Sequence, residues 1–183
     1  MSSRLPQEGS RINREKTVDF RFNGKNLKGF YGDTVASALL ANNEMFVARS
    51  FKYHRPRGIF SAGEEEPNAL MGIGEGPFFE PNIRATEVKL KQNMNVASQN
   101  HWPSLKFDFL SINNLFSSFF AAGFYYKTFM WPRAAWKHLF EPMIRRASGL
   151  GNAPREYDEE HYEHIYHHTD CLLYTSDAAD DSG

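Results

Sequence analysis

A block of positive charge constrains the fold of this chain more than any other feature of its sequence. Residues 49–58 hold four permanent cations and one histidine, and none of the ten is acidic. Because like charges repel, a folded chain keeps such a block only in water or against an anion. Phe51 and Tyr53 alternate with the cations, which favours an extended segment with one packed face and one polar face. Pro56 and Gly58 then predict a rigid loop that contains turns.

The sequence leaves two interpretations of this basic loop open. Three consecutive glutamates, residues 64–66, follow it after five intervening residues and offer ion pairs to the cations of a solvated hairpin. Alternatively, the cationic face contacts an anion outside the loop. The candidate site residues of the second interpretation are Arg49, Lys52, His54, Arg55 and Arg57.

Length and composition narrow the function classes. A chain of 183 residues predicts one domain plus an appendage. Its net charge of −1 excludes a globally basic nucleic-acid binder, although basic and aromatic residues do interleave at 49–57. No run of about 18 apolar residues and no apolar leader is present, so cytoplasm is the default compartment. The only cysteine, Cys171, rules out a disulfide framework or a four-cysteine cluster built from this chain alone.

The first half of the chain predicts an α+β roll. Residues 17–22 alternate as a half-buried strand, the Asn-Gly pair at 23–24 is a strong hairpin turn, and 27–31 return as a second strand. Asp33 or Thr34 is placed to cap a helix that ends at Asn42-Asn43. Further strands are expected at residues 45–50, 69–73 and 85–90. Helix and strands together make the roll.

Residues 98–151 are an aromatic-rich extension in which the sequence predicts only short helices. Residues 112–120 are ambiguous between strand and helix. Pro132 is expected to start a helix, and Pro142 to interrupt or kink it near Glu141. So many aromatic residues would make a sticky surface on a free monomer. The extension therefore packs either on a partner or longer chain, or on the roll of residues 17–97, and the sequence leaves both open.

Several motifs resemble one family. The stretch R-S-F-K-Y-H-R-P-R-G-I, followed by E-E-P-N-A-L, resembles the N-terminal domain of the α subunit of heterotetrameric sarcosine oxidase. The same family is matched by G-D-T-V-A-S-A-L-L-A-N at 32–42, N-H-W-P-S-L-K-F-D at 100–108, A-G-F-Y-Y-K-T-F-M-W-P at 122–132, I-R-R-A-S-G-L-G-N-A-P-R-E at 144–156 and Y-E-H-I-Y-H-H-T-D at 162–170. The resemblance covers about residues 17 to 170 in the right order.

The resemblance implies a domain layout. Residues 1–16 would be a flexible N-terminal arm, 17–97 a ferredoxin-like (β-grasp) domain related to two-iron, two-sulfur domains, and 98–151 the aromatic extension. Some relatives carry cluster cysteines after the helix, but residues 49–63 have none, so the basic loop would replace the cluster loop. Residues 152–170 would be a linker towards a dinucleotide-binding domain. The chain has no G-x-G-x-x-G, and residues 171–183 resemble a translated sequencing adapter, so we expect a truncated chain with a non-native tail.

The resemblance also implies a function. The complete enzyme would contain α, β, γ and δ subunits with FAD, FMN and NAD, oxidise sarcosine to glycine and hydrogen peroxide, and pass the one-carbon unit to tetrahydrofolate. This fragment would carry no cofactor and no catalytic or metal-binding residue. Its basic loop would contact a flavin phosphate or acidic groups of a neighbouring subunit, since arginine suits phosphate through paired hydrogen bonds. Its partners would be the other subunits and the remainder of the α chain, with no nucleic acid and no membrane. Two alternatives are the equivalent subunit of N-methylglutamate dehydrogenase and a ferredoxin-like electron-transfer module.

Overall fold

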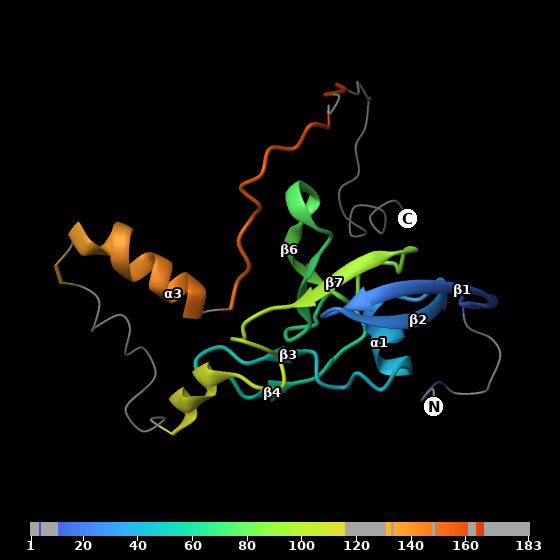
Figure 1. Ribbon diagram of the computed structural model, residues 1–183, viewed down its shortest axis with the longest axis horizontal. Coiled ribbons are helices and arrows are strands. Elements are labelled where there is room, and N and C mark those ends of the chain that lie inside the picture. Colours follow the sequence, from blue (N-terminus) through green and yellow to red (C-terminus); the bar gives the residue numbers. More distant parts are fainter. Residues whose placement is uncertain are drawn as a thin grey trace, which may run out of the picture.

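A mixed five-stranded sheet with a helix on one face forms the centre of the molecule (Figure 1). The computed structural model describes residues 4, 11–115, 131–132, 134–147, 149–160 and 164–166. The strand order is β2-β1-β7-β5-β6, in which β1 and β7 are parallel and the other neighbours are antiparallel. The elements are β1 (Asn13–Phe22), β2 (Lys25–Tyr31), α1 (Val35–Ala41), β5 (Leu70–Ile73), β6 (Glu80–Arg84) and β7 (Met94–Ser98).

The first hairpin forms where the sequence predicts it. Asn23 and Gly24 make the turn with φ values of 49° and 78°, a left-handed conformation that asparagine and glycine tolerate best. The alternation along β1 turns Val18, Phe20 and Phe22 inward, where each is at most 4% exposed. The strand begins at Asn13, four residues before the predicted start at Thr17.

Helix α1 is held at its N-terminus by a capping box. The Thr34 hydroxyl accepts from the Ser37 backbone N–H at 3.1 Å, and the Ser37 hydroxyl accepts from the Thr34 N–H at 3.0 Å. Asp33, fully buried just before the cap, pairs with Arg4 through contacts of 3.0 and 2.6 Å. The helix start is therefore joined to the N-terminal arm as well as to the core.

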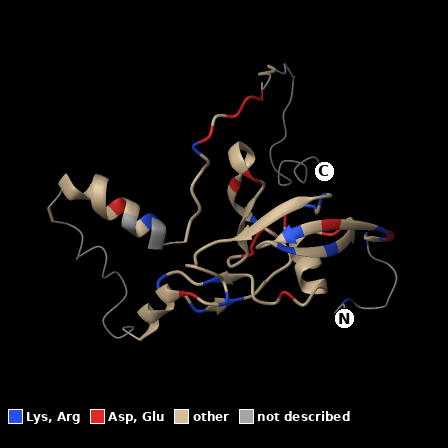
Figure 2. Ribbon diagram, in the orientation of Figure 1, with Lys and Arg blue, Asp and Glu red and all other residues tan. Residues whose placement is uncertain are grey.

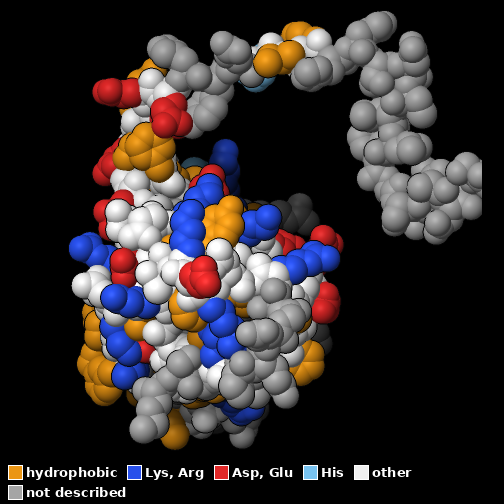
Figure 3. Space-filling view, turned by 90° about the vertical axis from the view of Figure 1, so that its right-hand side faces the viewer, with side chains coloured by type: hydrophobic (Ala, Val, Ile, Leu, Met, Phe, Trp, Pro, Cys, Tyr) orange, Lys and Arg blue, Asp and Glu red, His pale blue; other side chains and the backbone are white. Residues whose placement is uncertain are grey.

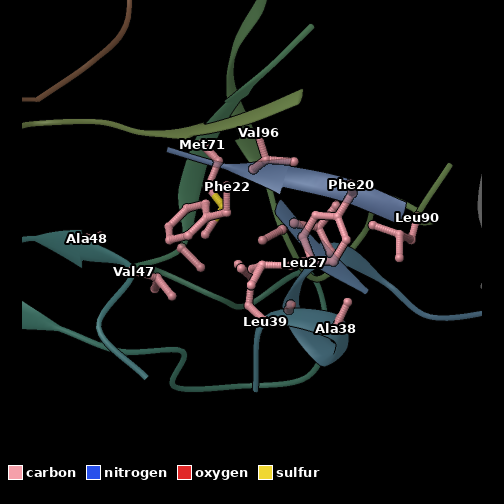
Figure 4. Close-up of a cluster of buried hydrophobic side chains, with 14 of the residues drawn as sticks. Phe20, Phe22, Leu27, Ala38, Leu39, Val47, Ala48, Met71, Leu90 and Val96 are labelled. Carbon is pink, nitrogen blue, oxygen red and sulfur yellow. The ribbon is translucent and has the colours of Figure 1, made fainter. Parts of the chain in front are cut away.

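The core lies between the sheet and α1 (Figure 4). Phe20 and Phe22 from β1 and Val96 from β7 lie above Leu39 of α1, and Met71 of β5 fills the space beside them. Each is almost fully buried, and burying such a side chain contributes about 1.5–3 kcal/mol.

The strand predicted at residues 85–90 is wrong. Ala85 and Leu90 are buried, but the segment is a turn that makes one isolated bridge to α1's cap. Its carbonyls serve the helix instead: Ala36 donates its N–H to the Ala85 oxygen at 2.8 Å, and Val35 donates to the Val88 oxygen at 2.9 Å. The first turn of a helix leaves such N–H groups without intrahelical acceptors, so this segment satisfies α1 rather than the sheet. Strands β6 and β7 take its place.

The basic loop contains a small second sheet. The predicted strand at 45–50 is reduced to β3 (Ala48–Arg49), which pairs antiparallel with β4 (Pro56–Arg57).

A short helical turn, η1 (Gly76–Phe78), lies between β5 and β6. Residues 116–130 and 167–183 lie outside the described residues, and with them most of the ambiguous 112–120 stretch and the whole predicted tail.

The aromatic extension contains η2 (Phe109–Asn114), η4 (Trp136–Phe140) and α3 (Glu141–Ala147). In the helix that the sequence predicts to start at Pro132, the first helical residue that the structure describes is Ala134. Near Glu141, where the sequence predicts a disturbance, a π-helical turn meets a regular α-helix. Pro142 cannot donate a backbone hydrogen bond and crowds the preceding turn, which accounts for the wider turn before it. No helix among the described residues is long and apolar enough to cross a membrane.

We expect Leu39→Ala to lower the free energy of unfolding by about 3 kcal/mol, because it leaves a cavity under β1 in a fully packed core. Urea denaturation of the chain measures the change. Leu115→Ala is the matched control, since Leu115 is 78% exposed and its truncation should cost less than about 0.5 kcal/mol. Equal effects of the two substitutions would contradict this packing.

Candidate functional site

The carboxylate of Asp108 organises the inner side of the basic loop. It is 5% exposed, and its Oδ2 lies 2.8 Å from His54 Nδ1 and 3.4 Å from Arg49 Nε. Its Oδ1 accepts the backbone N–H groups of Trp102 and Leu110 at 3.0 and 3.1 Å. The acid missing from the basic loop is thus supplied by a residue more than fifty positions away.

Arg49 is a structural residue in this arrangement. Its side chain is 7% exposed, and each guanidinium nitrogen donates to a backbone oxygen: Nε to Leu105 at 2.8 Å, and the two others to His54 at 2.7 Å and Lys106 at 3.1 Å. It also stacks over Phe46 at 5.0 Å. A buried arginine needs such complete pairing because its desolvation is costly.

The other three predicted cations lie on the outer side. The amine of Lys52 and the guanidinium of Arg55 each lie 4.9 Å from the centre of the Tyr53 ring, and Arg55 donates to Asn114 Oδ1 at 2.9 Å. Arg57 is exposed on β4. Figure 2 shows positive charge gathered along the β3–β4 segment. The structure therefore splits the five predicted residues: Arg49 and His54 turn inward, and Lys52, Arg55 and Arg57 lie on the outer side, where contact with an anion stays a prediction.

The tip of the loop has an unusual backbone. Lys52 and His54 have φ values of 70° and 53°, in the left-handed region that residues with a side chain rarely adopt. Such strain persists only where the surroundings impose it, and it concentrates at functional positions. Here the carbonyl of His54 is held by Arg49 and its ring by Asp108.

A second buried carboxylate, Glu66, lies in the segment that follows the basic loop and closes residues 60–69. It is 1% exposed and accepts four backbone N–H groups at 2.6–3.2 Å, those of Phe60, Ser61, Asn68 and Ala69. Burial raises the pKa of Glu66, but the four donors lower it by more, so the pKa lies below its ordinary value of 4.5. For Glu66 the predicted pairing with the cations is wrong, because backbone donors occupy both oxygens.

His101 lies at the base of the same region. Its Nε2 is 2.8 Å from the Ser98 hydroxyl, which in turn bonds Asn23 at the β1–β2 turn. Burial lowers the pKa of His101, partly offset by the nearby Asp108 carboxylate. Sequence reasoning missed Asp108, Glu66 and His101 as site residues. For Asp108 the available signal was its place in the N-H-W-P-S-L-K-F-D motif.

The fold and the sequence of the loop are similar to those of known proteins. Residues 15–101 match the family described as "2Fe-2S iron-sulfur cluster binding domain". The sarcosine oxidase subunit alpha of Rhizobium meliloti (strain 1021) is 54% identical over 172 residues, which are 94% of this chain and 17% of the relative. The subunit of that name from Corynebacterium sp. (strain U-96) is 44% identical over 90 residues, 48% of this chain and 9% of the relative. Among solved structures, L-proline dehydrogenase from P. horikoshii has a TM-score of 0.39 and 28% identity, covering 48% of this chain and 16% of that one.

The five-stranded sheet with α1 on one face and the match over residues 15–101 give the α+β, ferredoxin-like (β-grasp) fold that the sequence predicts. More particularly, the chain is homologous to the N-terminal part of sarcosine oxidase α subunits and spans about one sixth of the first relative's length. The cluster does not fit the residues present. It requires thiolate ligands, and residues 15–101 contain no cysteine. The buried carboxylates beside the loop, Glu66 and Asp108, are already bound by protein donors.

We expect Asp108→Asn to destabilise the chain by about 3–5 kcal/mol, because it leaves Arg49 buried without its counter-charge. Urea denaturation at neutral pH measures this loss. Asp19→Asn is the control: Asp19 is 55% exposed and its contact with Lys28 is 3.9 Å, so less than about 1 kcal/mol should be lost. If Asp108→Asn costs no more stability than Asp19→Asn, the contacts of Asp108 with Arg49 and His54 do not hold the basic loop in place.

Glu66 should make stability depend on acid pH. Since its pKa is lower in the folded state than in the unfolded state, its contribution is present above the ordinary value of 4.5 and is lost as pH falls through the folded-state pKa. Glu66→Gln should lower the free energy of unfolding by about 2 kcal/mol at neutral pH, because the NH2 group of glutamine faces backbone N–H donors instead of accepting from them. The variant should also lose less stability than the unaltered chain as the pH falls below 4.5. Denaturation across this pH range measures both effects. The exposed Glu64→Gln is the control, and a parallel pH profile for Glu66→Gln and the unaltered chain would contradict the assignment.

Proposed function

We propose that this chain is the N-terminal structural and assembly part of a sarcosine oxidase α subunit. The observation that carries the proposal is the 54% identity to such a subunit across 94% of the chain. In this proposal the complete complex has α, β, γ and δ subunits with FAD, FMN, NAD and tetrahydrofolate. It demethylates sarcosine oxidatively to glycine and transfers the one-carbon unit. The chemistry belongs to parts of the complex outside this chain, which spans 17% of the relative.

The geometry supports a binding role for the basic loop rather than a chemical one. Arg49 donates all three of its guanidinium nitrogens to backbone oxygens, and the buried His54 ring is fixed through Nδ1 by Asp108, so both side chains support the loop from within. Lys52 and Arg55 are held beside the Tyr53 ring, so these two side chains would lose little conformational entropy when an anion binds. We infer that these two and Arg57 bind a flavin phosphate or the carboxylates of a neighbouring subunit.

The choice of amine rests on the relatives. The three curated matches are all called sarcosine oxidase subunit alpha, which favours sarcosine over N-methylglutamate. A role in electron transfer lacks support, because the matched domain has no cysteine to hold a cluster.

If the outer cations bind flavin phosphate, Arg55→Ala combined with Arg57→Ala should lower the flavin content of the assembled complex several-fold. The reason is that two phosphate contacts with paired hydrogen bonds are lost. Flavin absorbance per mole of purified complex measures the occupancy, and size-exclusion chromatography measures assembly. Loss of assembly with intact flavin binding would instead assign the loop to a subunit contact.

Lys89→Ala combined with Lys91→Ala is the matched control, since both lysines are exposed and lie near α1's cap rather than in the basic loop. Figure 3, which faces the β1–β2 side, shows cations interspersed with carboxylates on that surface. Removing two charges there should change neither property. Unchanged flavin content and unchanged assembly in the arginine variant would reject the proposed role of the loop.

A further inference from the structure

Three exposed aromatic side chains are ordered against one another on the segment after β7. Trp102, Phe107 and Phe109 are 55%, 61% and 54% exposed. The ring centroids of Trp102 and Phe109 are 5.3 Å apart, and Phe107 meets Phe109 edge to face at 4.9 Å. Aromatic residues grouped in this way are typical of the centres of protein interfaces. We call residues 102–110 the aromatic hairpin.

The backbone of the aromatic hairpin is fixed from within. Phe109 donates its N–H to the Trp102 oxygen at 2.8 Å, and Ser104 donates to the Phe107 oxygen at 3.1 Å. Asp108 accepts from Trp102 and Leu110 on its inner side. The aromatic side chains are therefore presented on a rigid support, so binding would cost little conformational entropy.

Apolar and basic groups continue this surface on either side. Ile112 and Leu115 in and after η2 are 56% and 78% exposed. Arg55 of the basic loop donates to Asn114 of the same turn, so this cation lies beside the apolar residues. In residues 49–60 and 101–115 the only acidic residue is the buried Asp108. A complementary partner has an apolar centre and carboxylates at its margin.

The chain returns to the root of this surface before it leaves the domain. Gly151 exchanges hydrogen bonds of 2.8 and 3.3 Å with the side chain of Asn82. Gly149 lies so close to Asn100 that an added Cβ would be 2.4 Å from the Asn100 Cβ. Asn100 in turn donates to the carbonyls of Arg49 and Ser50 at 3.2 and 3.0 Å. Residues 149–151 are thus anchored on Asn82 of β6 and on Asn100, which lies two residues before the aromatic hairpin, and the chain then continues past η1, where the Glu156 carboxylate is 3.0 Å from a Cβ added at Gly76.

We propose that the aromatic hairpin, with Ile112 and Leu115, is the docking surface for the remainder of the α subunit. This inference rests on the proposed function, and it names the partner as a later part of the same polypeptide. The homologous subunit is about six times as long as this chain, and a tethered partner binds at a high effective concentration. An exposed apolar surface of this kind is ordinarily covered.

Hydroxyl-radical footprinting tests the proposal on three samples: this 183-residue chain, the full-length α subunit alone, and the assembled complex. Oxidation of Trp102, Phe107 and Phe109 should fall about fivefold or more in the α subunit alone, because a packed interface excludes water from its centre. Phe78, 51% exposed on η1, is the internal control and should keep its rate. Protection that appears only in the complex would assign the surface to another subunit, and protection that grows with the concentration of the 183-residue chain would assign it to a second copy. Either result, or no protection at all, overturns the inference.

Two variants separate docking from folding. Phe107→Ser and Lys106→Glu alter exposed side chains, so the melting temperature of the 183-residue chain should not change, whereas both should restore oxidation of Trp102 in the α subunit. Phe78→Ser and Lys91→Glu are the matched controls and should leave Trp102 protected. If all four variants leave the protection unchanged, the proposed contact is wrong. Failure of the proposed function is seen separately, as a complex that forms no peroxide from sarcosine.

Discussion

The buried carboxylate of Asp108 is the contact on which the outer surface of this domain depends. It joins His54 and Arg49 of the basic loop to the backbone of Trp102 and Leu110 in the aromatic hairpin. A buried ion pair stabilises a fold only if desolvation is offset by complete hydrogen bonding, and here both oxygens and every nitrogen of Arg49 have a protein partner. One side chain therefore fixes the positions of two surface features that are far apart in sequence.

Glu66 gives the other end of the loop the same kind of support. Four backbone N–H groups converge on one carboxylate, so residues 60–69 are closed around a negative charge. In a metal-binding domain, the cluster and its ligands order the loop, and their binding energy contributes to folding. This chain matches such a family without its cysteines, and two buried carboxylates with their hydrogen bonds order the loop instead. The fold is kept although the ligand set is absent.

The sequence predicts those parts of the fold whose causes are local. The Asn23-Gly24 turn, the inward face of β1 and the Thr34 cap all follow from residue type and spacing. Residues 85–90 have strand-like spacing as well, but their carbonyls are taken by the first turn of α1, a partner about fifty positions earlier. Strand β7 shows the opposite case, since its weak local pattern is overridden by pairing with β1 and β5. Local pattern and tertiary partner compete, and only the first is visible in one sequence.

The same competition decides which cations of the basic loop are functional candidates. Nothing near Arg49 in the sequence distinguishes it from Arg55, because the residue that draws Arg49 inward is Asp108. Once Arg49 is neutralised, the repulsion within the loop falls, and the Tyr53 ring accommodates Lys52 and Arg55 at equal distance. The loop can then hold its remaining cations towards solvent although its own sequence contains no acidic residue. Exposed aromatic rings are costly to leave in water, whereas the cations beside them are well solvated and would attract an acidic partner, so in our proposal the inner ion pair prepares the outer surface for assembly.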